Sequence, residues 1–279
     1  MSFETIWHGN LSRIVALGDR AFLRLGNLPV RDQCNVGILL ASDGIVLIDY
    51  PEQHPDDEIL REVETLFHKK VTHIVFTHAH GDHRNGLSSL MRNDIVLMAS
   101  PAGADEIRAC CPELQNPVRI LEDREQFGIG DLRFSIQIPR RLPAHSPWDM
   151  LIGCDTENLL FTGDFLNPPD TLYFHSSNYL NWQAEMEVLL CQKQWKYLIL
   201  GHGLPWPVKN GKLSLDYLSA LGKLFEALQQ KGFVVTEKTD YPQLCRQLPE
   251  LKEELTFLTE TAGSAHVLRQ LKEIQHSLA

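Results

Sequence analysis

The segment Thr77-His78-Ala79-His80-Gly81-Asp82-His83 contains the residues of this chain best suited to chemistry. It directly follows an apolar run typical of a buried strand. Residues i and i+2 of an extended segment point to the same side, so we expect His78 and His80 to converge. Gly81 permits a tight turn that returns Asp82 and His83 to the same place. Imidazoles and a carboxylate together suit zinc, with iron or manganese as alternatives.

Three further candidates follow downstream, each after an apolar run. His145 lies in the loop Pro143-Ala144-His145-Ser146-Pro147, Asp164 follows Leu160-Phe161-Thr162-Gly163, and His202 lies between two glycines. Taken singly, each would be an ordinary polar or turn residue. Their order after the first cluster makes them candidate metal ligands. Asp49 ends an earlier strand-like run in the same way.

In this order the residues resemble the metallo-β-lactamase superfamily, over about residues 34 to 203. The resemblance implies an α/β fold, the αββα four-layer sandwich, with two mixed sheets face to face, helices outside and metals at one edge. It also implies a dinuclear centre. By that pattern His78, His80 and His145 bind the first metal, Asp82, His83 and His202 bind the second, and Asp164 bridges both. Asp49 is expected to orient a ligand imidazole from behind it.

The activity implied by the resemblance is that of a metal-dependent hydrolase. Two divalent ions, preferably zinc, would activate a bridging water or hydroxide to attack an ester, thioester, lactone or phosphodiester of a small molecule. Asp82 is also a catalytic candidate, because its carboxylate could accept or relay a proton. A bridging Asp at position 164 is typical of the glyoxalase II and lactonase-like branch. It is not typical of the familiar zinc β-lactamases.

Two alternatives remain open on the same scaffold. An iron enzyme resembling sulfur dioxygenases would contain one iron per chain. A non-catalytic ligand sensor would capture a small molecule without turning it over. Altered ligand positions are the usual sign of either alternative, and every ligand position of the pattern is present here.

Aromatic residues gather in the loops that follow the candidate ligands. They suit an apolar acyl or aryl substrate, although they could equally cover the core. The candidate pocket residues are Trp148, Tyr173, His175, Tyr179 and Trp206.

Strand and helix signals alternate over the first 200 residues. Residues 34–41 and 45–49 form a predicted hairpin around Ser42-Asp43-Gly44, and residues 151–154 and 159–162 form a second. Helices are predicted over 56–70 and 182–190, and strands over 73–77, 95–98, 132–138 and 197–200. Helical periodicity dominates after residue 210. We therefore predict a catalytic domain over residues 1–210 and a helical C-terminal extension over 211–279, which could pack on the same domain.

Composition limits the partners of the chain. Its 279 residues have a net charge of −10 and no basic stripe, so we expect no nucleic-acid partner. No apolar run is long enough to span a membrane, and the N-terminus does not read as a secretory signal. The six cysteines show no metal-binding or redox spacing. We therefore expect reduced thiols, a cytoplasmic location and a small-molecule substrate; the sequence leaves the oligomeric state open.

Overall fold

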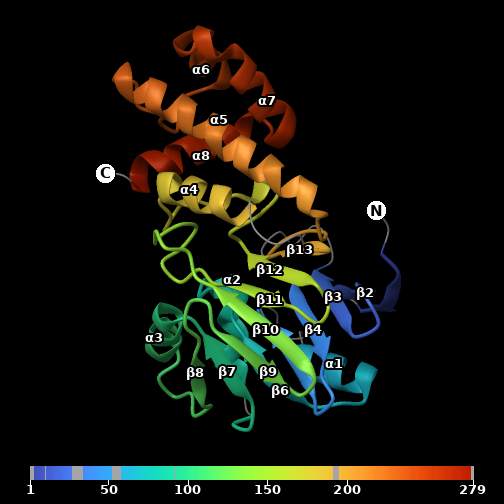
Figure 1. Cartoon of the computed structure of the whole chain (residues 1–279). Helices are drawn as coiled ribbons and strands as arrows, with labels where there is room; N and C mark the ends of the chain where they lie inside the picture. The colour runs from blue at the N-terminus through green and yellow to red at the C-terminus, as the bar shows by residue number, and fades with distance from the viewer. Residues whose placement is uncertain are drawn as a thin grey trace. The chain divides into compact units, whose positions relative to one another are not determined.

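The computed structural model describes residues 3–9, 11–26, 34–51, 58–90, 92–190 and 195–277 (Figure 1). The chain forms two compact units, each built from three segments. The sheet unit comprises Met1–Pro139, Trp148–Gly163 and Trp195–Pro207. The helical unit comprises Arg140–Pro147, Asp164–Gln194 and Val208–Ala279. The prediction that residues 1–210 form a domain of their own stays a prediction.

The first sheet of the sheet unit has eight strands in sequential order. Neighbours pair antiparallel from β1 to β5 and parallel from β5 to β8. The predicted hairpin around Ser42-Asp43-Gly44 is present as β4 and β5. The strands are β1 Thr5–His8, β2 Ser12–Ala16, β3 Ala21–Gly26, β4 Val36–Leu40, β5 Ile45–Ile48, β6 Val71–Val75, β7 Val96–Ala99 and β8 Val118–Ile120.

The second sheet has five strands in the order β13-β12-β11-β10-β9. Its pairs are antiparallel except β12 and β13, which are parallel. Both sheets are therefore mixed, as predicted, and the second predicted hairpin is β11 and β12. The strands are β9 Gln126–Ile129, β10 Leu132–Gln137, β11 Leu151–Cys154, β12 Leu159–Gly163 and β13 Tyr197–Leu200.

The core of the sheet unit lies between the two sheets. Side chains of β10 alternate along the strand, and Leu132, Phe134 and Ile136 are buried in one cluster with residues of the first sheet such as Leu39 and Val75. A second cluster lies on the other face of the first sheet, where helices α1 (Ile59–Phe67) and α3 (Pro101–Cys110) pack. Two layers of apolar contact thus fix the strands whose ends carry the candidate ligands.

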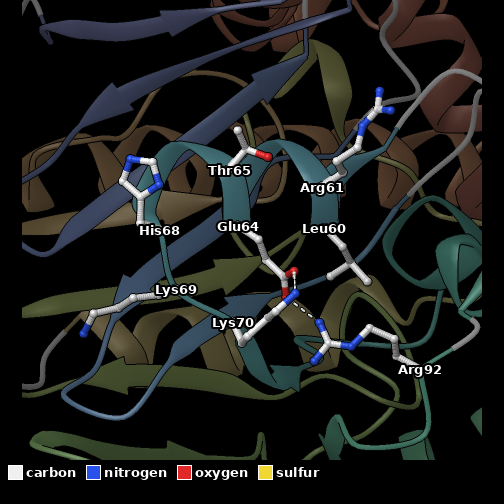
Figure 2. Close-up of a pocket in the computed structure, with 8 residues that line it drawn as sticks. All are labelled: Leu60, Arg61, Glu64, Thr65, His68, Lys69, Lys70 and Arg92. Carbon is white, nitrogen blue, oxygen red and sulfur yellow. Dashed lines mark hydrogen bonds and ion pairs between the residues drawn. The ribbon is translucent and has the colours of Figure 1, made fainter.

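Helix α1 crosses from β5 to β6, as a parallel strand pair requires. A hollow of about 520 Å³ opens beside it, and basic side chains line this hollow (Figure 2). The Glu64 carboxylate accepts hydrogen bonds from Lys70 Nζ and Val71 N, both at 2.9 Å, and from Arg92. This network ties the helix to the start of β6, and none of the candidate ligands lines the hollow.

The helical unit contains α4 (Tyr179–Leu190), α5 (Gly211–Gln230), α6 (Tyr241–Gln247), α7 (Lys252–Ala262) and α8 (Ser264–Ser277). One buried face of α5 carries Tyr217, Leu221 and Leu224, which recur at helical spacing. The Tyr217 hydroxyl donates to Gln270 Oε1 of α8 at 2.7 Å, which satisfies both buried polar groups. The predicted helical C-terminal region is therefore present.

Among the described residues, no helix combines the length and the apolarity needed to cross a bilayer. The five described cysteines are free thiols, and Cys191 lies outside the described residues.

Candidate metal centre

The loop after β6 brings the first two candidate ligands together within the sheet unit. His78 Nε2 and His80 Nδ1 lie 3.0 Å apart. Two ring nitrogens this close need a proton or a metal ion between them. Two zinc–nitrogen bonds at a tetrahedral angle would place the nitrogens about 3.3 Å apart, so the spacing suits a shared ion. Gly81 is the first residue of the short helix α2 (Gly81–Arg84), so a helical turn rather than a left-handed one returns the chain.

Three other residues of the sheet unit offer a second set of donors. Asp82, His83 and His202 each present a ligand atom, and these atoms lie within 4.8 Å of one another. His202 Nε2 is 3.2 Å from Asp82 Oδ2. The His83 side chain is fully buried, whereas 31% of the Asp82 side chain is exposed. The set can therefore be reached from the side of Asp82.

Asp49 supports two of these imidazoles from behind. It is buried, with a φ of 64°, directly after β5. Its carboxylate accepts hydrogen bonds at 2.8 Å from Thr77 N, Thr77 Oγ1 and His83 Nδ1. Because the Thr77 hydroxyl donates to Asp49, its oxygen is left to accept from His78 Nδ1, at 3.1 Å. Both Nδ1 atoms then carry the proton, and each Nε2 keeps the lone pair that a metal needs.

Two more residues position the loops of this site in the sheet unit. Asn35 Nδ2 donates to the carbonyls of Leu200 and Gly203, at 2.9 and 2.7 Å, and so clamps the loop that carries His202. Gly163 has a φ of 49°, and a Cβ there would lie 2.4 Å from Thr77 Oγ1. Only glycine allows β12 to pass the threonine hydroxyl at this distance.

The remaining two candidate ligands belong to the helical unit. His145 Nε2 is 3.9 Å from Asp164 Oδ2, and both side chains are more than nine-tenths buried. The ring of His145 meets that of Trp182 at 5.0 Å between centroids. A histidine and a carboxylate at this spacing are donors of the same kind as those in the sheet unit.

The predicted pocket residues are distributed over both units. In the sheet unit, the ring of Trp148 meets His80 edge-on at 5.4 Å, and the backbone of Trp206 pairs with Leu198. In the helical unit, Tyr173 and His175 are exposed and stack on each other, with centroids 5.7 Å apart. Tyr179 is buried, and its ring packs on Phe225 of α5. Its hydroxyl donates to Glu226 at 3.3 Å, so that ring is engaged between two helices.

Cys34 presents a sulfur donor beside Asp49 and His83. Burial raises the pKa of the Cys34 thiol to about 12. Its Sγ donates to the backbone oxygen of Asn35 at 3.3 Å, so the thiol is engaged with the chain itself.

No pattern in the sequence predicted a role for Thr77, Asn35 or Gly163. Thr77 and Gly163 directly precede the candidate ligands His78 and Asp164. Their place beside a ligand could therefore have indicated a supporting role for both. Asn35 had no such signal, because its contacts with Leu200 and Gly203 join segments more than 160 residues apart.

Comparison with known proteins agrees with this geometry. The family model of the metallo-beta-lactamase superfamily matches residues 29–202, well over half of the chain. The lactamase-like protein nscB of Arthroderma otae is 32% identical over 96 residues, which is 34% of this chain and 24% of that protein. The match therefore spans about a quarter of the length of that relative.

Solved structures show the same fold. A metallo-beta-lactamase from Pontibacter korlensis is 18% identical, with a TM-score of 0.65 over 75% of this chain and 99% of that one. VMB-1 is 17% identical, with a TM-score of 0.65 over 77% and 100%. A metallo-beta-lactamase from Erythrobacter litoralis is 17% identical, with a TM-score of 0.62 over 76% and 98%. The predicted fold class is confirmed, and the chain belongs to the metallo-β-lactamase superfamily.

Proposed function

We propose that this chain is a metal-dependent hydrolase that cleaves an ester, thioester, lactone or phosphodiester bond of a small molecule. The observation that carries the proposal is the hydrogen-bond network of Asp49 and Thr77. It leaves His78 Nε2 and His83 Nε2 as lone-pair donors, beside the His80, Asp82 and His202 atoms described above. A buried carboxylate spent on orienting imidazoles is typical of a metal site.

Seven residues are proposed as ligands of two divalent ions, with zinc as the preferred metal and iron or manganese as alternatives. His78, His80 and His145 would hold one ion, Asp82, His83 and His202 the other, and Asp164 would bridge the two. His145 and Asp164 enter this set on the order of the ligands along the chain, which follows the superfamily pattern. Bound ions would lower the pKa of water toward 7 and polarise the substrate carbonyl or phosphoryl oxygen.

The residues of the chain supply orientation and proton transfer. Asp49 and Thr77 fix the ring positions of His78 and His83. Asp82, partly exposed and 3.2 Å from His202, is placed to accept the proton that an incoming water loses at its Oδ2 atom. Trp148, edge-on to His80, is proposed as one wall of the substrate pocket.

The residue at position 164 supports a finer assignment within the superfamily. A bridging aspartate resembles the glyoxalase II and lactonase-like branch, and we propose that this chain belongs with it. The absence of a basic stripe from the sequence supports a small-molecule substrate over a polynucleotide. A cytoplasmic location remains part of this proposal.

The test begins with the metal content of protein purified without added metal, measured by elemental mass spectrometry. We expect two zinc ions per chain, and turnover within a panel of esters, thioesters, lactones and phosphodiesters. The kcat/KM of a His78→Ala variant should fall by about 100-fold or more. The variant lacks the imidazole that would bind the metal, and Thr77 then has no ring to orient. A Glu113→Gln variant, altered at an exposed turn after α3, is the matched control and should keep full activity.

Three results would count against the proposal. A protein with two zinc ions that turns over nothing in the panel would favour a ligand sensor. One iron per chain with oxygen consumption on sulfur substrates would favour the dioxygenase alternative. Activity retained in His78→Ala would remove this site from the reaction.

A further inference from the structure

Helix α4 of the helical unit (Figure 1) carries a fully buried aromatic residue, Trp182. Its Nε1–H donates to the backbone oxygen of Phe165 at 2.9 Å, and Phe165 directly follows Asp164. The same indole packs against His145, with centroids 5.0 Å apart and the rings inclined at 62°. We propose that Trp182 is a positioning residue that holds His145 and Asp164 in register with each other, an inference that rests on the proposed metal site.

Neither ligand is held by a regular element. Residues 140–148 contain no helix or strand, and Asp164 lies in a turn directly after the left-handed Gly163. In a strand or helix, the regular backbone sets the direction in which each side chain points. Here that direction has to be fixed by contacts from outside the loop.

Helix α4 supplies those contacts to the loop that carries His145. Glu185 accepts from Arg140 N at 3.0 Å and from the Arg141 guanidinium at 3.2 Å. Asn181 Nδ2 donates to the oxygen of Pro143 at 3.2 Å. Glu185 is four positions from Asn181 and three from Trp182, so the three residues lie along one side of the helix. The side of α4 that holds the loop therefore also carries the indole.

The orientation of the indole is fixed by its own contacts. The fully buried ring of Phe174 packs on the indole, with centroids 5.4 Å apart at 55°. A rotated indole would leave a buried N–H without an acceptor, which is unfavourable. Trp182 can therefore transmit the position of α4 to His145 through ring contact and to Asp164 through the Phe165 carbonyl.

The proposal distinguishes Trp182 from an ordinary core aromatic. A core residue acts only on stability, whereas a positioning residue also acts on metal affinity and on the geometry of the bound ion. Trp182→Phe keeps an aromatic ring and loses the N–H donor. Trp182→Leu loses both. Phe225→Leu is the matched control, because that buried ring packs on Tyr179 in the same unit.

The experiment uses the full chain and measures Zn²⁺ affinity by competition with a chromophoric chelator. The visible absorption spectrum of the Co²⁺-loaded protein is recorded alongside, because it reports ligand geometry. We expect roughly tenfold weaker binding in Trp182→Leu, a smaller loss in Trp182→Phe, and altered Co²⁺ spectra in both. Phe225→Leu should lower the unfolding temperature of the metal-free protein while keeping wild-type affinity and spectrum.

Unchanged affinity and spectra in both Trp182 variants would overturn the proposal and leave the proposed function standing. Equal losses in Phe225→Leu at an equal loss of stability would overturn it too, since the effect would then be general destabilisation. If Trp182→Leu does not fold, Trp182→Phe decides by the same two readouts. A wild-type chain that binds neither Zn²⁺ nor Co²⁺ would instead overturn the proposed metal site, and this inference with it.

Discussion

A single carboxylate organises the part of the site that lies in the sheet unit. Asp49 reaches the imidazole of His83 directly and that of His78 through the hydroxyl of Thr77. Each of these hydrogen bonds favours the tautomer whose proton is on Nδ1, the ring nitrogen that faces away from the candidate ion. The Thr77 hydroxyl therefore links Asp49 to the imidazole of His78. Because it donates to Asp49, its oxygen accepts from His78 Nδ1 and so selects the tautomer of that ring.

Removing that hydroxyl is the sharpest test at the scale of one residue. Thr77→Val keeps the shape of the side chain, and we expect about tenfold weaker Zn²⁺ binding, because the Nδ1 proton of His78 loses its acceptor. Competition with a chromophoric chelator measures the affinity.

Thr162→Val is the matched control for this change. Thr162 is buried to 2% exposure, and its hydroxyl donates to backbone oxygens of Gly163 and Ile199. Both variants therefore remove a buried threonine hydroxyl that donates a hydrogen bond, and only the one at position 77 should weaken binding. Equal affinity losses in both would show that the Thr77 hydroxyl acts through stability alone.

The first candidate ligands could be predicted because their spacing is local, whereas His145, Asp164 and His202 could be predicted only from their order along the chain, which resembles the superfamily pattern. Four of the seven occur within six positions, and a chance cluster of that kind is rare. The supporting residues could not be predicted in the same way. Asn35 reaches the His202 loop only after the first sheet has formed, and nothing in its neighbours along the chain indicates that contact.

At the scale of elements, several strands with continuous or alternating apolar runs were predicted, whereas β3, which a charged residue interrupts, was missed. Buried and more exposed side chains alternate along β10, and almost every residue of β4 and β5 is buried. Each of these strands therefore has an apolar pattern that can be recognised in the sequence. Strand β3 includes Arg24, which is 1% exposed and paired with Glu62 of α1. A buried ion pair looks like a surface position in a sequence. Helix α3 buries small residues such as Gly103 and Ala104, which leave no visible apolar stripe.

Glu64 provides a prediction at this scale, because it joins α1 to β6 and to Arg92 (Figure 2). Partial burial alone would raise the pKa of the Glu64 carboxyl, but hydrogen bonds from Lys70, Val71 N and Arg92 lower it below its usual value. A carboxyl with a lowered pKa in the folded state stabilises the fold above its unfolded pKa of about 4.3, and this contribution is lost as the pH falls.

We therefore expect Glu64→Gln to lower the free energy of unfolding by about 1–2 kcal/mol at pH 7. The difference from wild type should shrink as the pH falls from 6 to 3, since protonation removes the same charge from the wild type. Urea unfolding of the metal-free protein, in the presence of a chelator, measures the free energy of unfolding and its dependence on pH. Glu113→Gln, at an exposed turn, should show no such difference. A gap that stays constant with pH would mean that the charge of Glu64 is not what stabilises the junction.

At the scale of the whole molecule, the chain passes repeatedly between its two units. The helical unit takes up residues 140–147 and 164–194 as well as the C-terminal helices, and the first two segments carry His145 and Asp164. The sequence suggested a boundary at residue 210 because the periodicity changes there. The periodicity of apolar residues indicates whether a segment is a helix or a strand, but it does not indicate which other segments pack against it. The contacts that join α8 to the segment around Leu172 run from polar side chains to backbone oxygens, which leave no pattern in a sequence.

Removing residues 211–279 tests whether the segments that carry His145 and Asp164 need the C-terminal helices to keep their structure. Helix α8 holds the segment before α4 directly, since Glu273 accepts from Phe174 N at 3.1 Å and Gln270 donates to the oxygen of Pro169 at 2.8 Å. Helix α5 covers Tyr179 of α4. Each large apolar side chain exposed by the truncation costs about 1.5–3 kcal/mol, and several would be exposed together.

We therefore expect a chain that ends at residue 210 to bind a hydrophobic dye, to self-associate, and to lose measurable Zn²⁺ affinity. The last effect should follow because the segments carrying His145 and Asp164 would lose their support. Supplying residues 208–279 as a separate polypeptide should partly reverse all three effects, since it returns the missing helices without peptide continuity. Gel filtration, dye fluorescence and chelator competition measure these outcomes. A monomeric truncated chain with cooperative unfolding and wild-type affinity would contradict the prediction. It would mean that residues 1–210 form a complete catalytic domain and that the C-terminal helices serve another purpose.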